Sequence, residues 1–267
     1  MNPTLIEEHR INYYSDQLVA HFAQVYGEGF ISPGGPAEVA RIVEGIPLHG
    51  LDVLDIGCGI GGPAATLVRE CGANSITSID IQPGQVERAR QYIASQGLSA
   101  RVCPTLVERG PLPFADNTFD IVFSKEALNE VDDKFAIFQE IYRVLKPGGW
   151  LLASDWMSGD RPLSNAFHIW ASSMNLPITF EHLSTVRGML SQSGFTPVTL
   201  THRADWYRQE AVSELNQMEG PLRKRLMQIH HNDERILRMA SAYHRTMLRL
   251  LDSGEFCPAH LRARKPL

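Results

Sequence analysis

The stretch Asp55-Ile-Gly-Cys-Gly-Ile-Gly-Gly62 decides the fold of this chain of 267 residues. It overlaps the end of the apolar run Leu51–Ile56, a pattern that predicts a buried strand entering a glycine-dense turn. Glycines let the backbone approach a ligand closely, and the following helix offers its N-terminal N–H groups. Asp80 follows a second apolar run, roughly 20 residues on, where such a site would hold a ribose.

Asp55 discriminates between the ligands that this turn could bind. Gly57, Gly59 and Gly62 satisfy the dinucleotide spacing G-x-G-x-x-G, which is a weak signal by itself. A diphosphate about 4–6 Å from Asp55 would be repelled by roughly 3–4 kcal/mol at an effective dielectric of about 20. A ligand with an ammonium and a sulfonium would be attracted instead. The sequence therefore favours S-adenosylmethionine over a dinucleotide; the alternative is a glycine turn without a ligand.

The composition is that of an ordinary globular protein, with 43% hydrophobic and 21% charged residues and a net charge of −5. No basic stripe is present, so nucleic acid and anionic membranes are not expected partners. The apolar runs are far shorter than the ~20 residues that span a bilayer, and residues 1–10 lack a signal-peptide core, so we expect a cytoplasmic protein. The cysteines and histidines lack metal-ligand spacing, which predicts no metal site.

Strand and helix patterns alternate five times up to residue 154, which predicts an α/β, doubly wound, Rossmann-like fold with a mostly parallel, seven-stranded sheet. The expected strands are Leu51–Ile56, Ser75–Ile79, Ala100–Thr105, Thr118–Phe123, Trp150–Ser154, Thr196–Thr201 and Pro258–Arg264. The expected helices are Asp16–Tyr26, Pro36–Glu44, Pro63–Arg69, Pro83–Gln96, Phe135–Leu145 and Glu181–Ser193, followed by two helical patterns within Asp205–Asp252.

These elements predict four parts of the chain. Residues 1–49 would form an N-terminal helical cap. Residues 50–204 would form the cofactor-binding core, with an irregular, aromatic-rich lid segment at 157–180. Residues 205–253 would be a helical insertion, and residues 254–267 the final strand and tail.

Four motifs together resemble class I S-adenosylmethionine-dependent methyltransferases over about residues 50–155. They are Leu54-Asp-Ile-Gly-Cys-Gly59, Asp80, the Pro-Phe-x-x-x-x-Phe-Asp run at Pro113–Asp120, and Leu145-Lys-Pro-Gly-Gly149. Upstream, Tyr26-Gly-Glu-Gly-Phe-Ile-Ser-Pro-Gly-Gly35 resembles the equivalent segment of phosphoethanolamine N-methyltransferases. The resemblance implies a small-molecule methyltransferase that converts S-adenosylmethionine to S-adenosylhomocysteine.

The resemblance also implies individual roles. Tyr14 sits at the spacing of a tyrosine that closes over the active site, although it would equally suit a helix core. The expected cofactor contacts are Ile31, Ser32, Asp55, Gly57, Cys58, Gly59, Asp80, Ile81, Gln85, Glu108, Arg109 and Ser124. Glu108 and Arg109 depart from the family pattern and would otherwise be a solvated loop pair.

Departures from the phosphobase enzymes point to a different acceptor. Those enzymes carry Arg-Asp after the serine that ends the fourth strand and a histidine four residues beyond that aspartate. This chain has Lys125-Glu126, with Glu130 at the histidine position. Where their lid places an arginine and a tyrosine for the substrate phosphate, ungapped spacing gives Ser173 and Asn175. Because phosphate needs an arginine fork or an equivalent, we expect an acceptor without phosphate.

Methyl transfer to an amine requires that the nucleophile be positioned and that a proton be removed. Glu126 and Glu130 would share a face if their segment is helical, with Asn129 beside them, and carboxylates attract an amine and accept its proton. Together with Tyr14 they form the predicted catalytic cluster; alternatively, the glutamates are solvated helix charges. The predicted substrate contacts are Lys125, Trp156, His168 and Trp170, with Trp156 stacking on a cation.

We therefore predict methyl transfer from S-adenosylmethionine to a small non-phosphorylated amine or amino-acid-like acceptor. One alternative is an S- or O-methyltransferase of a small metabolite. Another is an enzyme that cyclises or cleaves S-adenosylmethionine itself. A third is a cofactor-binding regulatory or assembly protein that uses the helices of Asp205–Asp252 as a partner surface. The charge argument ranks a hydride-transfer dehydrogenase last.

Overall fold

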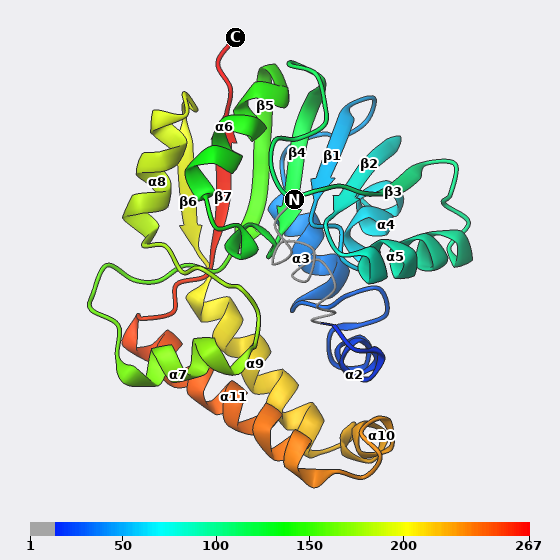
Figure 1. Cartoon of the computed structure of the whole chain (residues 1–267), viewed down its shortest axis with the longest axis vertical. Helices are drawn as coiled ribbons and strands as arrows, with labels where there is room; N and C mark the ends of the chain where they lie inside the picture. Colours follow the sequence, from blue (N-terminus) through cyan, green and yellow to red (C-terminus); the bar gives the residue numbers. More distant parts are fainter. Residues whose placement is uncertain (1–13) are drawn as a thin grey trace, which may run out of the picture.

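The computed structural model describes residues 14–267, which contain a seven-stranded sheet with the order β3-β2-β1-β4-β5-β7-β6 (Figure 1). β7 runs antiparallel to both of its neighbours, whereas the other neighbouring pairs are parallel. The predicted doubly wound, mostly parallel fold is confirmed. The strands are β1 (Asp52–Ile56), β2 (Ser75–Asp80), β3 (Val102–Leu106), β4 (Phe119–Lys125), β5 (Leu145–Asp155), β6 (Val198–His202) and β7 (Ala259–Arg264).

Helices connect these strands and form a layer beyond the end of the sheet. They are α2 (Asp16–Tyr26), α3 (Gly35–Ile42), α4 (Gly62–Arg69), α5 (Pro83–Ser95), α6 (Lys134–Val144), α7 (Asn165–Ser173), α8 (Leu183–Gln192), α9 (Ala204–Glu219), α10 (Arg223–Ile229) and α11 (Glu234–Ser253). Two expectations were wrong. The segment expected to be irregular contains α7, which begins where the Ser164 hydroxyl accepts from the Phe167 N–H, and the two helical patterns after residue 204 form three helices. Among residues 14–267, no helix combines the length and apolar content needed to cross a bilayer.

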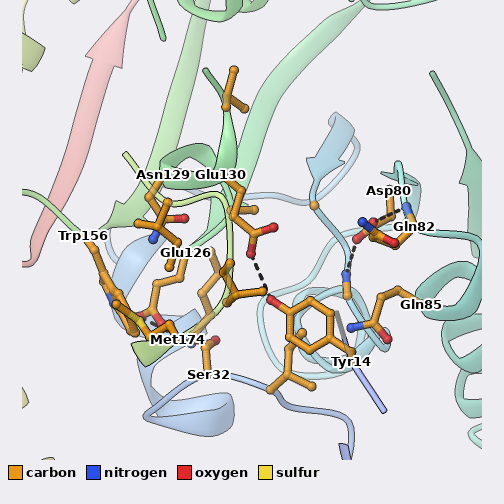
Figure 2. A pocket seen from close by; sticks show the side chains of 18 of the residues that line it. Tyr14, Ser32, Asp80, Gln82, Gln85, Glu126, Asn129, Glu130, Trp156 and Met174 are labelled. Atoms are coloured by element: carbon orange, nitrogen blue, oxygen red, sulfur yellow. Dashed lines mark hydrogen bonds and ion pairs between the residues drawn. The ribbon is translucent and has the colours of Figure 1, made fainter. Parts of the chain in front are cut away.

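The helices α7, α9 and α11 lie beyond the carboxyl ends of the parallel strands, and α10 joins the far ends of α9 and α11 and contacts α2 (Figure 1). A cavity of about 1080 Å³ lies between these helices and the strand ends (Figure 2). Ligands of open parallel sheets bind at this edge. The fold therefore places the glycine turn and the loop after β4 in one cavity.

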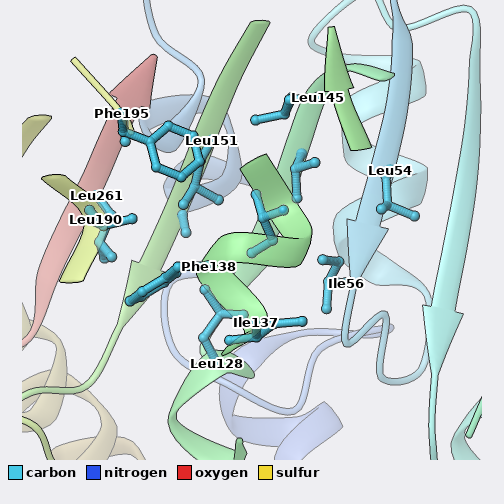
Figure 3. Close-up of a cluster of buried hydrophobic side chains, with 14 of the residues drawn as sticks. Leu54, Ile56, Leu128, Ile137, Phe138, Leu145, Leu151, Leu190, Phe195 and Leu261 are labelled. Atoms are coloured by element: carbon cyan, nitrogen blue, oxygen red, sulfur yellow. The ribbon is translucent and has the colours of Figure 1, made fainter. Parts of the chain in front are cut away.

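Each face of the sheet has its own buried core, because successive side chains of a strand point to opposite faces. Leu54 and Leu151 pack with Phe138 of α6 and Leu190 of α8 (Figure 3). The neighbouring strand residues face the other way and pack with α3, α4 and α5; they include Val53, Ile121 and Leu152. These two cores hold the strand ends, and thus the cavity wall, in fixed positions.

Candidate active site

The glycine turn after β1 is pinned against the end of β2. The N–H groups of Gly57 and Cys58 both donate to the Ile79 carbonyl, at 2.9 and 3.0 Å. Gly57 has a φ of 75°, and a Cβ added there would lie 2.1 Å from the Cβ of Ala127. Only glycine suits this position, since other residues would be strained and would clash.

Most backbone N–H groups of the turn already donate to acceptors within the protein. The Gly59 N–H donates to the Asp80 carboxylate at 3.0 Å and the Gly61 N–H to the Cys58 carbonyl at 3.0 Å. The Gly62 N–H donates to the Gly29 carbonyl at 2.9 Å, and the next residue, Pro63, has no N–H. A diphosphate would meet the Asp80 carboxylate here and few unused N–H groups, which supports the ligand preference inferred from charge.

Asp80 and Gln85 give the turn two polar groups suited to a nucleoside. The second Asp80 oxygen accepts from the Gln82 N–H at 2.9 Å (Figure 2). Burial raises the pKa of Asp80 to about 6, and the backbone N–H groups of Gln82, Gly59 and Ile81 oppose that rise. The Gln85 amide nitrogen is buried and has no hydrogen-bond partner in the described part of the chain. A ribose hydroxyl can donate to Asp80, and an acceptor atom can meet Gln85.

Two expected cofactor contacts lie behind the cavity wall. Asp55 pairs in register with Ser78 of β2, so the side chains share a face and the Ser78 hydroxyl donates to the carboxylate at 3.2 Å. Burial raises the pKa of Asp55 to about 7. The Ser124 hydroxyl donates to the Ile56 carbonyl at 2.9 Å. Neither Asp55 nor Ser124 is among the described residues that line the cavity, so the structure gives their predicted cofactor contact no support and it stays a prediction.

The loop after β4 carries Glu126 and Glu130, but not on one helix. Glu126 has a φ of 55°, and only Leu128–Glu130 form a short 3-10 turn, so the expected shared helix face was wrong. Both glutamates nevertheless line the cavity. The side chain of Glu126 is 3% exposed, which excludes the alternative of a solvated charge.

Glu126 is held on one side and free on the other. Its Oε1 accepts a hydrogen bond from the Tyr207 hydroxyl, which in turn accepts from Trp156 Nε1 at 3.3 Å. Its Oε2 is buried and has no hydrogen-bond partner within residues 14–267. Burial raises the pKa of Glu126 to about 7, although Lys125, 3.8 Å away, opposes that rise. A residue that lines the cavity therefore carries a buried carboxylate oxygen without a partner, on a group that titrates near neutral pH.

Glu130 meets the N-terminal segment. The Tyr14 hydroxyl donates to its Oε1 at 2.9 Å (Figure 2). Burial raises the pKa of Glu130 to about 7, whereas this hydrogen bond lowers it. Between the two glutamates, the Asn129 N–H donates to Asp155 at 3.0 Å, and its side-chain oxygen is buried without a partner among the described residues.

The other expected contacts occupy the rim and the floor. Lys125 donates to the Ser32 hydroxyl at 2.6 Å and to the Pro33 carbonyl at 2.8 Å, so it fixes the segment that follows α2. Ile31 also lines the cavity, together with the Cys58, Gly59 and Ile81 positions of the turn. Glu108 and Arg109 line its exposed edge.

An aromatic wall closes the end opposite the turn. Trp170 stacks on Trp156 with ring centroids 6.2 Å apart and on Tyr243 at 5.4 Å. Trp170 is 2% exposed. His168 is exposed and absent from the described cavity lining, so its prediction as a pocket residue was wrong. It lies two positions before Trp170 on α7, where the helix turns it toward solvent.

Sequence reasoning missed the residues that distant helices bring to this end. The His21 Nδ1 and His230 Nε2 atoms lie 2.8 Å apart, and both side chains line the cavity with Tyr243. Burial lowers the pKa of His21 to about 4, and His230 and His244 add to the effect. No local motif marks these residues, since His21 and Tyr243 belong to ordinary amphipathic helix patterns and His230 follows the end of α10.

Comparisons with known proteins agree with this architecture. Residues 54–153 match a methyltransferase domain family. Phosphoethanolamine N-methyltransferase 1 of Arabidopsis thaliana is 28% identical over 207 residues, which are 77% of this chain and 41% of that protein. The chain thus spans less than half the length of this relative.

Solved structures share the fold. Phosphoethanolamine N-methyltransferase 2 of Haemonchus contortus, in complex with phosphomonomethylethanolamine and S-adenosylhomocysteine, superposes with a TM-score of 0.86 at 23% identity, over 96% of this chain and 59% of that one. The cyclase SpnF superposes with a TM-score of 0.71 at 23% identity over 94% of both chains, so the fold alone does not define a reaction. The domain match, the relatives and the fold together support a class I S-adenosylmethionine-dependent methyltransferase, with the family match itself covering residues 54–153.

Proposed function

We propose that this protein binds S-adenosylmethionine at the glycine turn and transfers its methyl group to the amine nitrogen of a small acceptor without a phosphate. The observation that carries this proposal is the buried, unpartnered Oε2 of Glu126, a residue that lines the cavity together with Glu130 of the same loop. Two carboxylates favour a cationic amine over an anionic acceptor.

The residues present fit the cofactor. When bound, S-adenosylmethionine supplies an electrophilic methyl group on a positively charged sulfur. Asp80 would accept from its ribose hydroxyls, Gln85 would donate to it, and Ile81 would pack on the adenine. The occupied N–H groups of the turn disfavour a diphosphate, and the carboxylates around the cavity favour the sulfonium.

The acceptor end lacks a phosphate clamp among the described residues. The basic side chains of Lys and Arg in the cavity lining are Lys125 and Arg109. Lys125 already donates hydrogen bonds to Ser32 and Pro33. Arg109 lies at the exposed edge and donates to the Glu130 carbonyl at 3.5 Å. An amine that enters as an ammonium would instead give one proton to Glu126, whose pKa of about 7 suits that transfer at neutral pH.

Calorimetry and mass spectrometry test the proposal in two steps. S-adenosylmethionine and S-adenosylhomocysteine are titrated into the purified chain; no binding of either at millimolar concentration would reject the cofactor assignment. Ethanolamine, phosphoethanolamine and phenethylamine are then offered as acceptors. We expect methylated amine without phosphate and no methylated phosphoethanolamine. Methylthioadenosine formed from the cofactor alone, or methylation of thiol or phenol probes only, would replace the proposed reaction with another.

A further inference from the structure

Two buried oxygens on the loop after β4 lack hydrogen-bond partners. They are Glu126 Oε2 and Asn129 Oδ1, and no described residue donates to either. Both residues line the cavity (Figure 2). Buried acceptors are rarely left unpaired in proteins. A ligand that satisfies this pair must bring two donors to the same loop.

The Glu126 side chain and the Asn129 backbone are fixed in place by contacts from other elements. The Tyr207 hydroxyl of α9 holds Glu126 Oε1, and the Glu126 N–H donates to the Ser154 carbonyl of β5 at 2.8 Å. The Asn129 N–H donates to Asp155, and its carbonyl accepts from the Thr179 N–H at 2.8 Å. The Glu126 carboxylate is therefore preorganised, and the buried Asn129 side chain extends from a backbone that is held in place.

We propose that the acceptor is a primary amine, oriented by one N–H bond to Glu126 Oε2 and the other to Asn129 Oδ1. This inference rests on the proposed function. An entering ammonium loses one proton to Glu126, which releases it to solvent, so the neutral amine reacts. Its lone pair forms the N–C bond while the C–S bond breaks and leaves its electron pair on sulfur. The methylated product is a secondary ammonium, and the ionised Glu126 offsets its positive charge.

Counting N–H bonds then limits the number of methyl additions. A neutral primary amine satisfies both oxygens, a secondary amine satisfies one, and a tertiary amine satisfies neither. A site built to receive an N–H rejects an analogue that lacks it, because its own buried group is left unpaired. We expect kcat/KM to fall about 10-fold or more for each missing N–H. The monomethyl product therefore dominates, and a quaternary product does not form.

Phenethylamine, N-methylphenethylamine and N,N-dimethylphenethylamine test the order, since their ring suits the aromatic wall. The full chain is incubated with each amine and S-adenosylmethionine, and products are identified by mass spectrometry. We expect kcat/KM to be highest for the primary amine, lower for the secondary amine and lowest for the tertiary amine. Equal or faster methylation of the tertiary amine would overturn the inference while leaving amine methylation intact. Failure of the proposed function differs: the cofactor binds, but none of the three amines yields S-adenosylhomocysteine.

Variants assign the preference to the acceptor pair. Asn129→Leu removes one acceptor oxygen and should reduce the ratio of primary to secondary amine turnover about 10-fold. Asn216→Leu, on the exposed surface of α9, is the matched control and should keep the ratio. Asn129→Asp retains an acceptor oxygen at this position and should keep the order of turnover among the three amines. This variant serves as the test if Asn129→Leu fails to fold. An unchanged ratio in folded Asn129→Leu, or a lost order in Asn129→Asp, would reject the role of this side chain.

Discussion

Replacing Asp80 by asparagine should separate cofactor binding from folding stability. Burial raises the pKa of this carboxyl from 3.8 to about 6. At ~1.4 kcal/mol per pKa unit, its charge costs the folded state about 3 kcal/mol at neutral pH. Asp80→Asn removes that cost but turns an NH₂ group toward Gly59 or Gln82, which costs about 1–3 kcal/mol. The two effects offset, so we expect the free energy of unfolding to change by less than about 2 kcal/mol.

Cofactor affinity should respond differently to this substitution. Hydrogen bonds from ribose hydroxyls to a charged acceptor contribute about 1.5–3 kcal/mol each. Losing the charge should raise the Kd for S-adenosylhomocysteine roughly 10- to 150-fold. Titration calorimetry and urea unfolding at pH 7.5 measure both quantities, with Asp252→Asn, in an exposed ion pair with Arg208, as the control. A Kd for Asp80→Asn within threefold of the parent protein would refute the hydrogen bonds from the ribose to Asp80. A large loss of stability would refute the expectation that the two effects on the free energy of unfolding offset each other.

Three further predictions address the turn, the base and the cap. Gly62→Ala would place a Cβ 2.3 Å from the Gly29 carbonyl oxygen, so it should destabilise the protein in urea unfolding and weaken cofactor binding. The control Gly188→Ala, at an open position of α8, should stabilise the protein by about 0.5–1 kcal/mol in the same measurement. Glu126→Gln should lower kcat/KM by about 10²–10⁴ and flatten the rise of the rate through pH 7, because only the ionised carboxylate acts as a base; a pH–rate profile that still rises as in the parent would contradict this. The pKa of His21 is about 4 in the folded protein and 6.5 in the unfolded chain, so its contribution to the free energy of unfolding is fully present above pH 6.5 and is lost as the pH falls toward 4, by up to ~3 kcal/mol. His21→Gln should reduce this loss when the free energies of unfolding at pH 7.5 and 4.5 are compared.

The order of strands and helices could be predicted because apolar runs and glycine punctuation are local signals. The helix Asp16–Tyr26 has the predicted bounds. β5 was predicted too short, since Lys146-Pro-Gly-Gly149 reads as a break. In the structure, Leu145 already pairs with Phe119, and a register shift accommodates the intervening residues. The division into cap, core and insertion as separate parts stays a prediction.

The site was predictable only where topology alone brings residues together. Glu126 and Trp156 follow neighbouring parallel strands, so their convergence follows from strand order. The place of Asp55 outside the cavity lining was not predictable, because its register with Ser78, invisible in one sequence, turns the carboxylate toward β2. Tyr207 was missed because its contact with Glu126 joins elements far apart in the chain, and a tyrosine on an amphipathic helix looks like any core residue.

The segment that connects β6 to β7 leaves and rejoins the sheet at neighbouring positions. His202 pairs with Ala259, and the Arg203 N–H donates to the Pro258 carbonyl at 2.8 Å, so the antiparallel hairpin is complete without α9, α10 and α11. The three helices between β6 and β7 can therefore vary without disturbing the pairing of these two strands. Evolution can exchange them to recognise new acceptors while the strands that grip the nucleoside keep their register.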